Sequence, residues 1–259
     1  KKGREQMTIF VCGDGFDNIL CGVYDAWMSG LGHEDVKLMT RKEQQNQTMQ
    51  MFVQYRETED ALWKIKKTAE AVRRKISQEA YAWIYRASLS NEEGRADKIY
   101  RFLVKGFRSG SKIVTMLRDP DVYAVFSMNR QVANEAHLLT GFLRFSEQSA
   151  GLLAAVIRPE HDVLSLVANH FSERMSGERW LILDESRGSA ALHEPGRGFV
   201  ILSELPQKWR TYLSRQKAEG KYEELWRIFH SSVSIREREN RTCQNSHLPL
   251  RFRPYMTEF

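Results

Sequence analysis

The sequence has few cysteines and no long hydrophobic run, and each absence excludes a class of protein. Its 259 residues include only three cysteines, Cys12, Cys21 and Cys243, and none of them stands in a C-x-x-C pair. A disulfide framework or a zinc ribbon is therefore not expected, and a reducing cytoplasm fits this usage best. The longest aliphatic run, Leu152 to Ile157, is far shorter than the about twenty residues of a bilayer span, so we expect no transmembrane helix.

Motifs of the common enzyme classes are also missing. The sequence contains no G-x-x-x-x-G-K-[ST], H-E-x-x-H or G-x-S-x-G, no C-x-x-x-C-x-x-C, and no H-x-E with P-C-x-x-C. The seven histidines are scattered along the chain. We therefore expect no metal and no cofactor, and the sequence names no catalytic residue.

One glycine-rich turn resembles the start of a dinucleotide-binding motif but does not complete it. The predicted strand 7–12 leads through Gly13-Asp-Gly15 into a predicted helix, 16–28. The dinucleotide fingerprint needs a third glycine, which allows the helix to pack closely on the strand, and Asn18 stands there instead. A tight strand-to-helix turn is the favoured interpretation.

What the sequence does have is positive charge gathered in one segment. The chain carries a formal charge of +6, yet residues 61–118 alone hold 14 Lys and Arg against five acids. Clustered cations raise the local concentration of polyanions, so this asymmetry favours an anionic partner.

Within that segment, five cations recur at steps of three and four residues and share one face of a predicted helix. They are Lys98, Arg101, Lys105, Arg108 and Lys112. Ser90 and Glu93 are spaced as a capping box for its start, and glycines near 106–110 predict an end near Arg108, with Lys112 joining from the next turn. Asp97 is the only acid from 95 to 118. Such a row is often just a solvated face, but solvated faces usually mix signs. We predict that the row contacts nucleic-acid phosphates, together with Arg73, Arg74 and Lys75.

A second polar group is predicted on the helix that starts at Asp119-Pro120 and in the C-terminal tail. Its members are Arg130, Asn134 and His137 on the helix, and His247, Arg251, Arg253 and Tyr255 in the tail. These residues could contact phosphate and bases or, with a carboxylate such as Glu135, form an acid–base site. Equally, the helix residues could form a polar seam and the tail could anchor an extended segment.

The hydrophobic pattern predicts a mixed α+β fold. Residues 7–140 form a helix-rich basic region with a short strand pair, and residues 141–259 form an antiparallel sheet with flanking helices and an extended tail. The last three strands, near 180–183, 190–193 and 199–202, are expected to form a meander. We expect the two regions to pack as one unit.

Several longer motifs resemble a bacterial family of probable DNA metabolism proteins. They are Met-Thr-Ile-Phe-Val-Cys at 7–12, Tyr-Asp-Ala-Trp at 24–27, Arg-Lys-Ile-Ser at 74–77, Asn-Arg at 129–130, Asn-Glu-Ala-His-Leu-Leu-Thr-Gly-Phe at 134–142 and the tail from Leu248 to Phe259. The resemblance runs from Met7 to Phe259.

This resemblance implies a role in DNA metabolism or repair. The family is similar to a domain of unknown function that elsewhere precedes a uracil-DNA glycosylase domain, and its stand-alone members are paired with a radical S-adenosylmethionine protein. Because neither glycosylase motifs nor cluster-binding cysteines occur here, the chemistry would belong to the partner. Our first hypothesis is a DNA-binding accessory protein that presents nucleic acid to a catalytic partner. The alternatives are a nucleic-acid-processing enzyme with an unrecognised active site and a protein-interaction module with a basic face.

Overall fold

The chain divides into two compact units. The computed structural model describes residues 7–48, 52–148, 151–215, 221–233, 240, 242–243, 245 and 248–256. Unit 1 is Lys1–Ala133 and unit 2 is Asn134–Phe259. The boundary lies earlier than the predicted one at 140/141, because helix α6 (Pro120–Phe142) begins in unit 1 and continues without a break into unit 2. Its first half contributes Val122, Val125 and Met128 to the core of unit 1.

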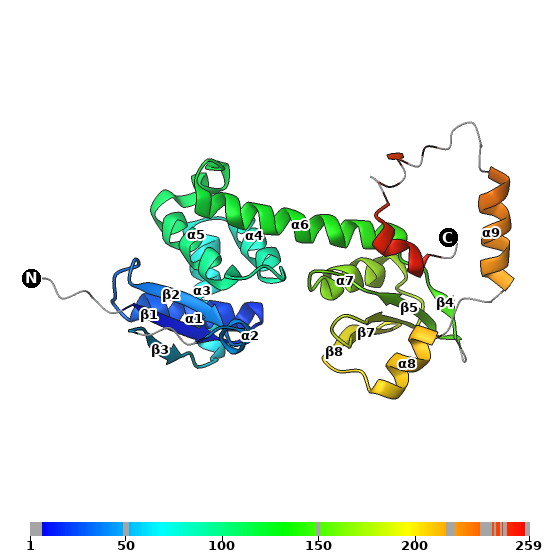
Figure 1. Cartoon of the computed structure of the whole chain (residues 1–259), viewed down its shortest axis with the longest axis horizontal. Helices are drawn as coiled ribbons and strands as arrows, with labels where there is room; N and C mark the ends of the chain where they lie inside the picture. The colour runs from blue at the N-terminus through cyan, green and yellow to red at the C-terminus, as the bar shows by residue number, and fades with distance from the viewer. Residues whose placement is uncertain are drawn as a thin grey trace, which may run out of the picture. The chain divides into compact units, whose positions relative to one another are not determined.

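Unit 1 is a small parallel sheet with helices packed against it (Figure 1). Its elements up to α6 are β1 (Thr8–Cys12), α1 (Phe16–Met28), β2 (Val36–Thr40), α2 (Arg41–Asn46), β3 (Gln54–Glu57), α3 (Leu62–Lys75), α4 (Gln78–Ser88), α5 (Arg95–Ser109) and the 3-10 helix η1 (Gly110–Thr115). The strand order is β2-β1-β3, and β1 is parallel to both neighbours. The predicted strand pair is therefore part of a three-stranded parallel sheet.

The central strand β1 is buried on both faces, as parallel strands usually are. Phe10 and Cys12 point into the main core with residues of α1, α3, α4 and α5, whereas Ile9 and Val11 belong to a smaller cluster on the other face. Burial raises the pKa of the Cys12 thiol to about 12, with Glu43 and Asp14 adding to the shift, so this thiol stays neutral. Cys12 is a core residue.

The starts of α2 and α5 are coupled, and the start of α5 differs from the sequence prediction. Helix α2 starts at a capping box, in which the Thr40 hydroxyl accepts the Glu43 N–H at 3.3 Å and the Glu43 carboxylate accepts the Thr40 N–H at 3.0 Å. The same carboxylate accepts the Gly94 N–H at 2.8 Å. Helix α5 begins after Gly94, at φ 73°, and not at the predicted Ser90–Glu93 capping box. Thr40 and Glu43 therefore form the capping box of α2, and Glu43 also fixes the start of α5.

Unit 2 is built around a five-stranded sheet in the order β4-β5-β6-β7-β8 (Figure 1). Its elements are β4 (Ser146–Glu147), β5 (Leu153–Ile157), α7 (Leu164–Arg174), β6 (Trp180–Asp184), β7 (Ser189–Glu194), β8 (Gly198–Leu202), α8 (Gln207–Arg215), α9 (Lys221–Val233) and the 3-10 helix η4 (Leu250–Tyr255). The meander β6-β7-β8 is confirmed.

The sheet of unit 2 is mixed, not purely antiparallel as predicted. Strands β5 and β6 run parallel, with Leu153 opposite Trp180 and Ile157 opposite Asp184. The reason is α7, which connects the two strands as a crossover helix and so returns the chain in the same direction. The mixed α and β class is confirmed, with helices dominant in the N-terminal half. Of the helices in the described part of the chain, none is both long and apolar enough to span a bilayer.

Candidate nucleic-acid interface

Helix α5 positions the predicted row of cations by burying its opposite side. Ile99, Phe102 and Leu103 are fully buried in the core of unit 1. Because residues three and four apart share a face, this burial turns Lys98, Arg101 and Lys105 away from the core, where they are partly exposed. The spacing argument from the sequence is therefore correct in its geometry.

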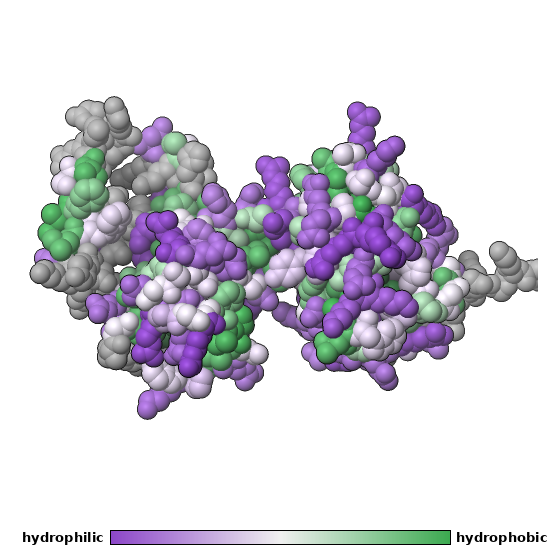
Figure 2. Space-filling view, turned by 180° about the vertical axis from the view of Figure 1, so that it is seen from behind, coloured by the Kyte–Doolittle hydropathy of each residue, from purple (hydrophilic) through white to green (hydrophobic). Residues whose placement is uncertain are grey.

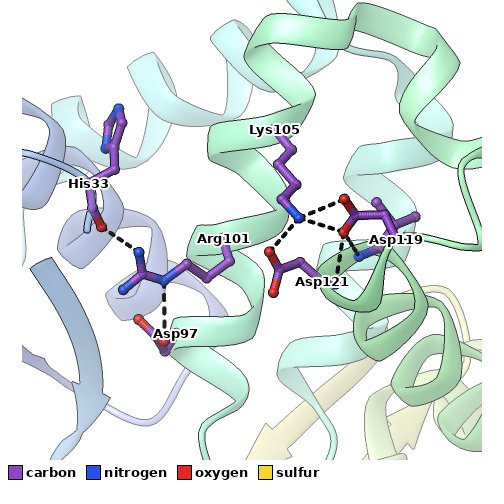
Figure 3. Close-up of polar contacts among 7 residues, drawn as sticks. His33, Asp97, Arg101, Lys105, Asp119 and Asp121 are labelled. Carbon is purple, nitrogen blue, oxygen red and sulfur yellow. Dashed lines mark hydrogen bonds and ion pairs between the residues drawn. The ribbon is translucent and has the colours of Figure 1, made fainter.

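The first two cations of the row are nevertheless engaged within the protein. Lys98 pairs with Glu92 and donates to the Glu93 carbonyl at 3.0 Å. Arg101 bonds the Asp97 carboxylate at 3.5 Å and donates to the backbone carbonyl of His33 (Figure 3). It also donates to the backbone carbonyl of Val36. Arg101 thereby ties α5 to the segment that leads into β2.

Lys105 is the most strongly neutralised of the five. Its Nζ lies 2.6 Å from both Asp119 oxygens and 2.7 Å from Asp121 Oδ2 (Figure 3). Burial alone would lower the pKa of Lys105, but the hydrogen bonds to the two carboxylates outweigh it and raise the pKa. The Lys105 bond is also the main cause that lowers the pKa of Asp119, against a smaller opposing effect of burial. Both groups are charged at neutral pH.

The prediction that Asp97 is the only acid near the row is therefore wrong for Lys98 and Lys105, whereas Arg101 pairs with Asp97 itself. Glu92, Asp119 and Asp121 lie just outside the window 95–118 in which acids are scarce, and the turns at either end of the helix bring them back to it. A wider window in the sequence would have found them, although not their contacts. These three cations hold α5 in place.

The other five predicted cations remain exposed. Arg108 and Lys112, and the triplet Arg73, Arg74 and Lys75, form no ion pair with any residue in the described part of the chain. Arg73 lies over the Tyr81 ring, 3.9 Å from its centroid. Arg108 acts on His33: burial is the main cause that lowers the pKa of this histidine, and the charges of Arg108 and Arg101 add to it. We call these five residues the exposed basic set.

The fold joins the two sequence-distant parts of the exposed basic set. Gly106 of α5 faces Ile76, the residue that ends α3, so closely that a Cβ on Gly106 would stand 2.7 Å from Ile76 Cδ1. A Cβ on Gly110 would stand 3.9 Å from the Lys75 carbonyl oxygen. The C-terminal ends of α3 and α5 therefore lie against each other, and the triplet 73–75 comes next to the turn that carries Lys112. Figure 2 shows one face of unit 1, at the right, covered mostly by hydrophilic side chains.

The described members of the predicted second polar group lie on α6 and in the tail, and Arg251 of the tail contacts Glu135 of α6. Arg130, Asn134 and His137 are exposed on α6. Arg253 of the tail bonds Asn245 at 2.7 Å. His247 and the side chain of Tyr255 lie outside the described residues.

Glu135, the carboxylate proposed for acid–base work, has a structural partner for each oxygen. It is buried and accepts the N–H groups of Glu160 at 2.9 Å and of His161 at 2.7 Å. Arg251 lies 3.1 Å from its Oε1 and 2.8 Å from Glu160. Glu135 therefore fastens the turn before α7 and the tail to α6.

The glycine-rich turn after β1 lies at the carboxyl end of a parallel strand, where open α/β sheets bind ligands. The Asn18 side chain folds back onto it and accepts the Gly15 N–H at 3.1 Å. A Cβ on Gly13 would stand 2.7 Å from Asn18 Cγ. The side chain in place of the third glycine thus packs against the turn itself.

Comparison with protein families gives a match over residues 93–258, more than half of the chain, to a domain of unknown function, DUF4130. The chain belongs to this family. No curated protein matches it. The DUF4130 match begins just before α5, so it contains Arg108 and Lys112 but not Arg73, Arg74 or Lys75. Among the described residues, no three His, Cys, Asp or Glu side chains are grouped so that they could hold a metal ion.

Proposed function

We propose that unit 1 binds nucleic acid through the exposed basic set. The observation that carries the proposal is the contrast within one predicted row. Lys98, Arg101 and Lys105 are neutralised by acids, whereas Arg108 and Lys112 are not and lie near a second unpaired group at the end of α3. If these cations served only solubility, we would expect acidic side chains among them on this surface.

In this proposal the chain acts as a DNA-binding accessory protein that presents nucleic acid to a catalytic partner. The resemblance to DNA metabolism proteins supports this role, with a radical S-adenosylmethionine protein or a glycosylase-like protein as the partner. The engagement of Glu135 by two backbone N–H groups and Arg251 weakens the enzymatic alternative, because this carboxylate is already used to hold the fold.

Neutralising the exposed basic set should reduce the salt dependence of DNA binding. Each phosphate contact contributes a slope of about −0.9 to log K against log salt on duplex DNA. The triple variant Arg74→Gln, Lys75→Gln, Lys112→Gln should therefore make the slope shallower by about 2.7, the product of three contacts and about 0.9 each. Fluorescence anisotropy of a labelled duplex across a salt series measures it.

The matched control changes the net charge equally at exposed cations of unit 2. Arg174→Gln, Arg197→Gln, Lys208→Gln should leave the slope as in the wild type. Lys105→Gln should also leave it unchanged, because Asp119 and Asp121 already neutralise that charge. Equal slopes for the two triple variants would contradict the proposal.

A further inference from the structure

A row of aromatic rings crosses α1 and α3 on the surface of unit 1. Tyr24 and Trp27 stand three residues apart on one face of α1. The Trp63 ring, at the start of α3, meets Tyr24 edge to face with 5.0 Å between centroids. Trp27 in turn packs on Phe107 of α5, also at 5.0 Å. Two ring pairs, Trp63–Tyr24 and Trp27–Phe107, are thus joined through the shared face of α1.

The two tryptophans at the surface of this row are unusually exposed. Trp63 is 56% exposed and Trp27 is 38% exposed, whereas Trp83 in the core of the same unit is 8% exposed. Sequence periodicity places Trp27 with the core residues of α1, but its position at the end of the helix brings it to the surface. Large exposed aromatic groups on a well-packed unit commonly mark a binding surface.

The charge around the row is set by α3. This helix carries six Lys and Arg and a single acid, Glu70. Lys64 is held by Asp25 at 2.8 Å, and Lys67 lies over the Tyr24 ring, 5.5 Å from its centroid. Lys66 and Lys67 are exposed, and along the same helix they lead towards the triplet 73–75.

Acids near the row include Asp25, which follows Tyr24 and pairs with Lys64, and exposed Glu34, which follows the His33 ring packed on Trp27. Glu59 and Asp60, which are exposed, precede α3 and lie on the side of Lys64. From Trp63 onwards, the cations along α3 far outnumber the acids. An acidic ligand that starts at the rings and follows the helix therefore meets increasing positive charge.

We infer that this surface binds single-stranded nucleic acid, with bases stacked on Trp63 and Trp27 and phosphates along Lys66, Lys67 and Arg74. The inference rests on the proposed function and specifies its substrate class. Exposed rings beside a track of cations suit an unpaired strand, whose base faces are free to stack, better than a duplex, whose bases are already stacked on one another. The cations of α3 argue against an apolar protein surface as the occupant. The exposed rings favour nucleic acid over an acidic protein surface, because bases stack on them.

The test compares single-stranded and duplex DNA of equal length at one salt concentration, by anisotropy of a labelled oligothymidine and of its duplex. Removing one stacking ring costs about 1–3 kcal/mol per base, so Trp63→Ala should weaken single-strand binding about 5- to 150-fold. Duplex binding should stay within a factor of about two, since no base face is read there. Trp63→Phe should keep most of the affinity, and Trp63→Leu should lose as much as Trp63→Ala.

The controls separate this inference from the proposed function. Trp209→Ala removes a tryptophan that is 53% exposed in unit 2 and should bind as the wild type does. Because Trp63 is exposed, its variants should keep the wild-type melting temperature, which circular dichroism checks. Wild-type protein that binds neither DNA overturns both proposals. Single-strand binding that Trp63→Ala leaves unchanged overturns only the inference. Full affinity in Trp63→Leu also overturns it, because a general apolar contact, as in protein docking, would then explain the surface.

Discussion

At the scale of single residues, Asp119 has two roles, of which the sequence shows only one. It caps α6, accepting the N–H of Asp121 at 2.9 Å and of Val122 at 3.4 Å. It also binds Lys105 of α5. The cap is readable from Asp119-Pro120 in the sequence, but the ion pair is not, because it depends on how η1 folds the chain back. One carboxylate therefore orients α6 and holds α5 beside it.

Replacing Asp119 should reveal both roles in the stability of the protein. Asp119→Ala loses the cap and the ion pair and should reduce the free energy of unfolding by about 1–2 kcal/mol. Asp119→Asn keeps a good cap and loses only the charge, so its loss should be below about 1 kcal/mol. Urea denaturation at neutral pH, followed by circular dichroism, measures both differences.

The charge-dependent part should vanish in acid. The pKa of Asp119 is lowered in the folded protein, so its charge adds stability above the ordinary Asp pKa, and this stability is lost as the pH falls through the lowered value. The gap between wild type and Asp119→Asn should therefore close as the pH falls below about 4. A gap that stays constant down to the acid transition would show that the Lys105 pair contributes nothing.

At the scale of elements, the sequence predicts what is local and periodic. The spacing of Ile99, Leu103 and the cations of α5 predicts the orientation of that helix correctly, as the turn residues around Gly188 and Gly196 predict the β6-β7-β8 meander. Whether strands pair in parallel or antiparallel could not be predicted from the sequence in the same way. The parallel pairing of β1 with β2 and of β5 with β6 depends on crossover helices and on distant partners, and the hydrophobic pattern of short buried strands does not distinguish the two directions.

The candidate site shows the same division between local and distant information. The exposed character of Arg74, Lys75 and Lys112 follows from composition and spacing. Their proximity depends on the close approach of Gly106 to Ile76, two residues thirty positions apart, which nothing in a single sequence reveals. The neutralisation of Lys98 and Lys105 was missed because Glu92 and Asp119 come from turns, where side-chain direction is not periodic.

Glu135 links three elements of unit 2, and its loss should be costly. Glu135→Ala leaves the part-buried N–H of Glu160 and the buried N–H of His161 without their carboxylate acceptor, and a buried unsatisfied group costs about 1–3 kcal/mol. The substitution also removes one of the two carboxylates that hold Arg251 of the tail. We expect a loss of at least about 2 kcal/mol in the free energy of unfolding, measured by urea denaturation.

Glu160→Ala is the matched control for Glu135. It keeps the backbone N–H that bonds Glu135 and removes only an exposed carboxylate from Arg251, so it should cost no more than about 1 kcal/mol. A catalytic Glu135 would instead show a loss of activity without a loss of stability. Equal stability of the two variants would contradict the structural role assigned to it.

At the scale of the whole molecule, the family boundary and the folding boundary do not coincide. The DUF4130 match starts at residue 93, yet α5, the first helix inside it, is the centre of the unit 1 core. Phe102 stacks on Trp83 of α4 with 6.3 Å between centroids, and Ile99 and Leu103 are buried in the cluster that includes Leu38 and Val72. Residues 7–92 are thus required to cover α5, although they lie before the match.

A fragment cut at the family boundary should therefore be poorly folded at its N-terminal end. Residues 93–259 keep α5 but lose the residues that bury its apolar side, and a fully buried Phe or Leu side chain contributes about 1.5–3 kcal/mol. We expect this fragment to bind the dye ANS strongly and to self-associate in size-exclusion chromatography. The fragment 134–259, which omits α5 and keeps the sheet of unit 2, should bind less dye per molecule. A monomeric 93–259 with the dye binding of the full chain would show that α5 is stable without α1, α3 and α4. In that case Arg73, Arg74 and Lys75, and the phosphate contacts proposed for them, would lie outside the folded core that contains α5.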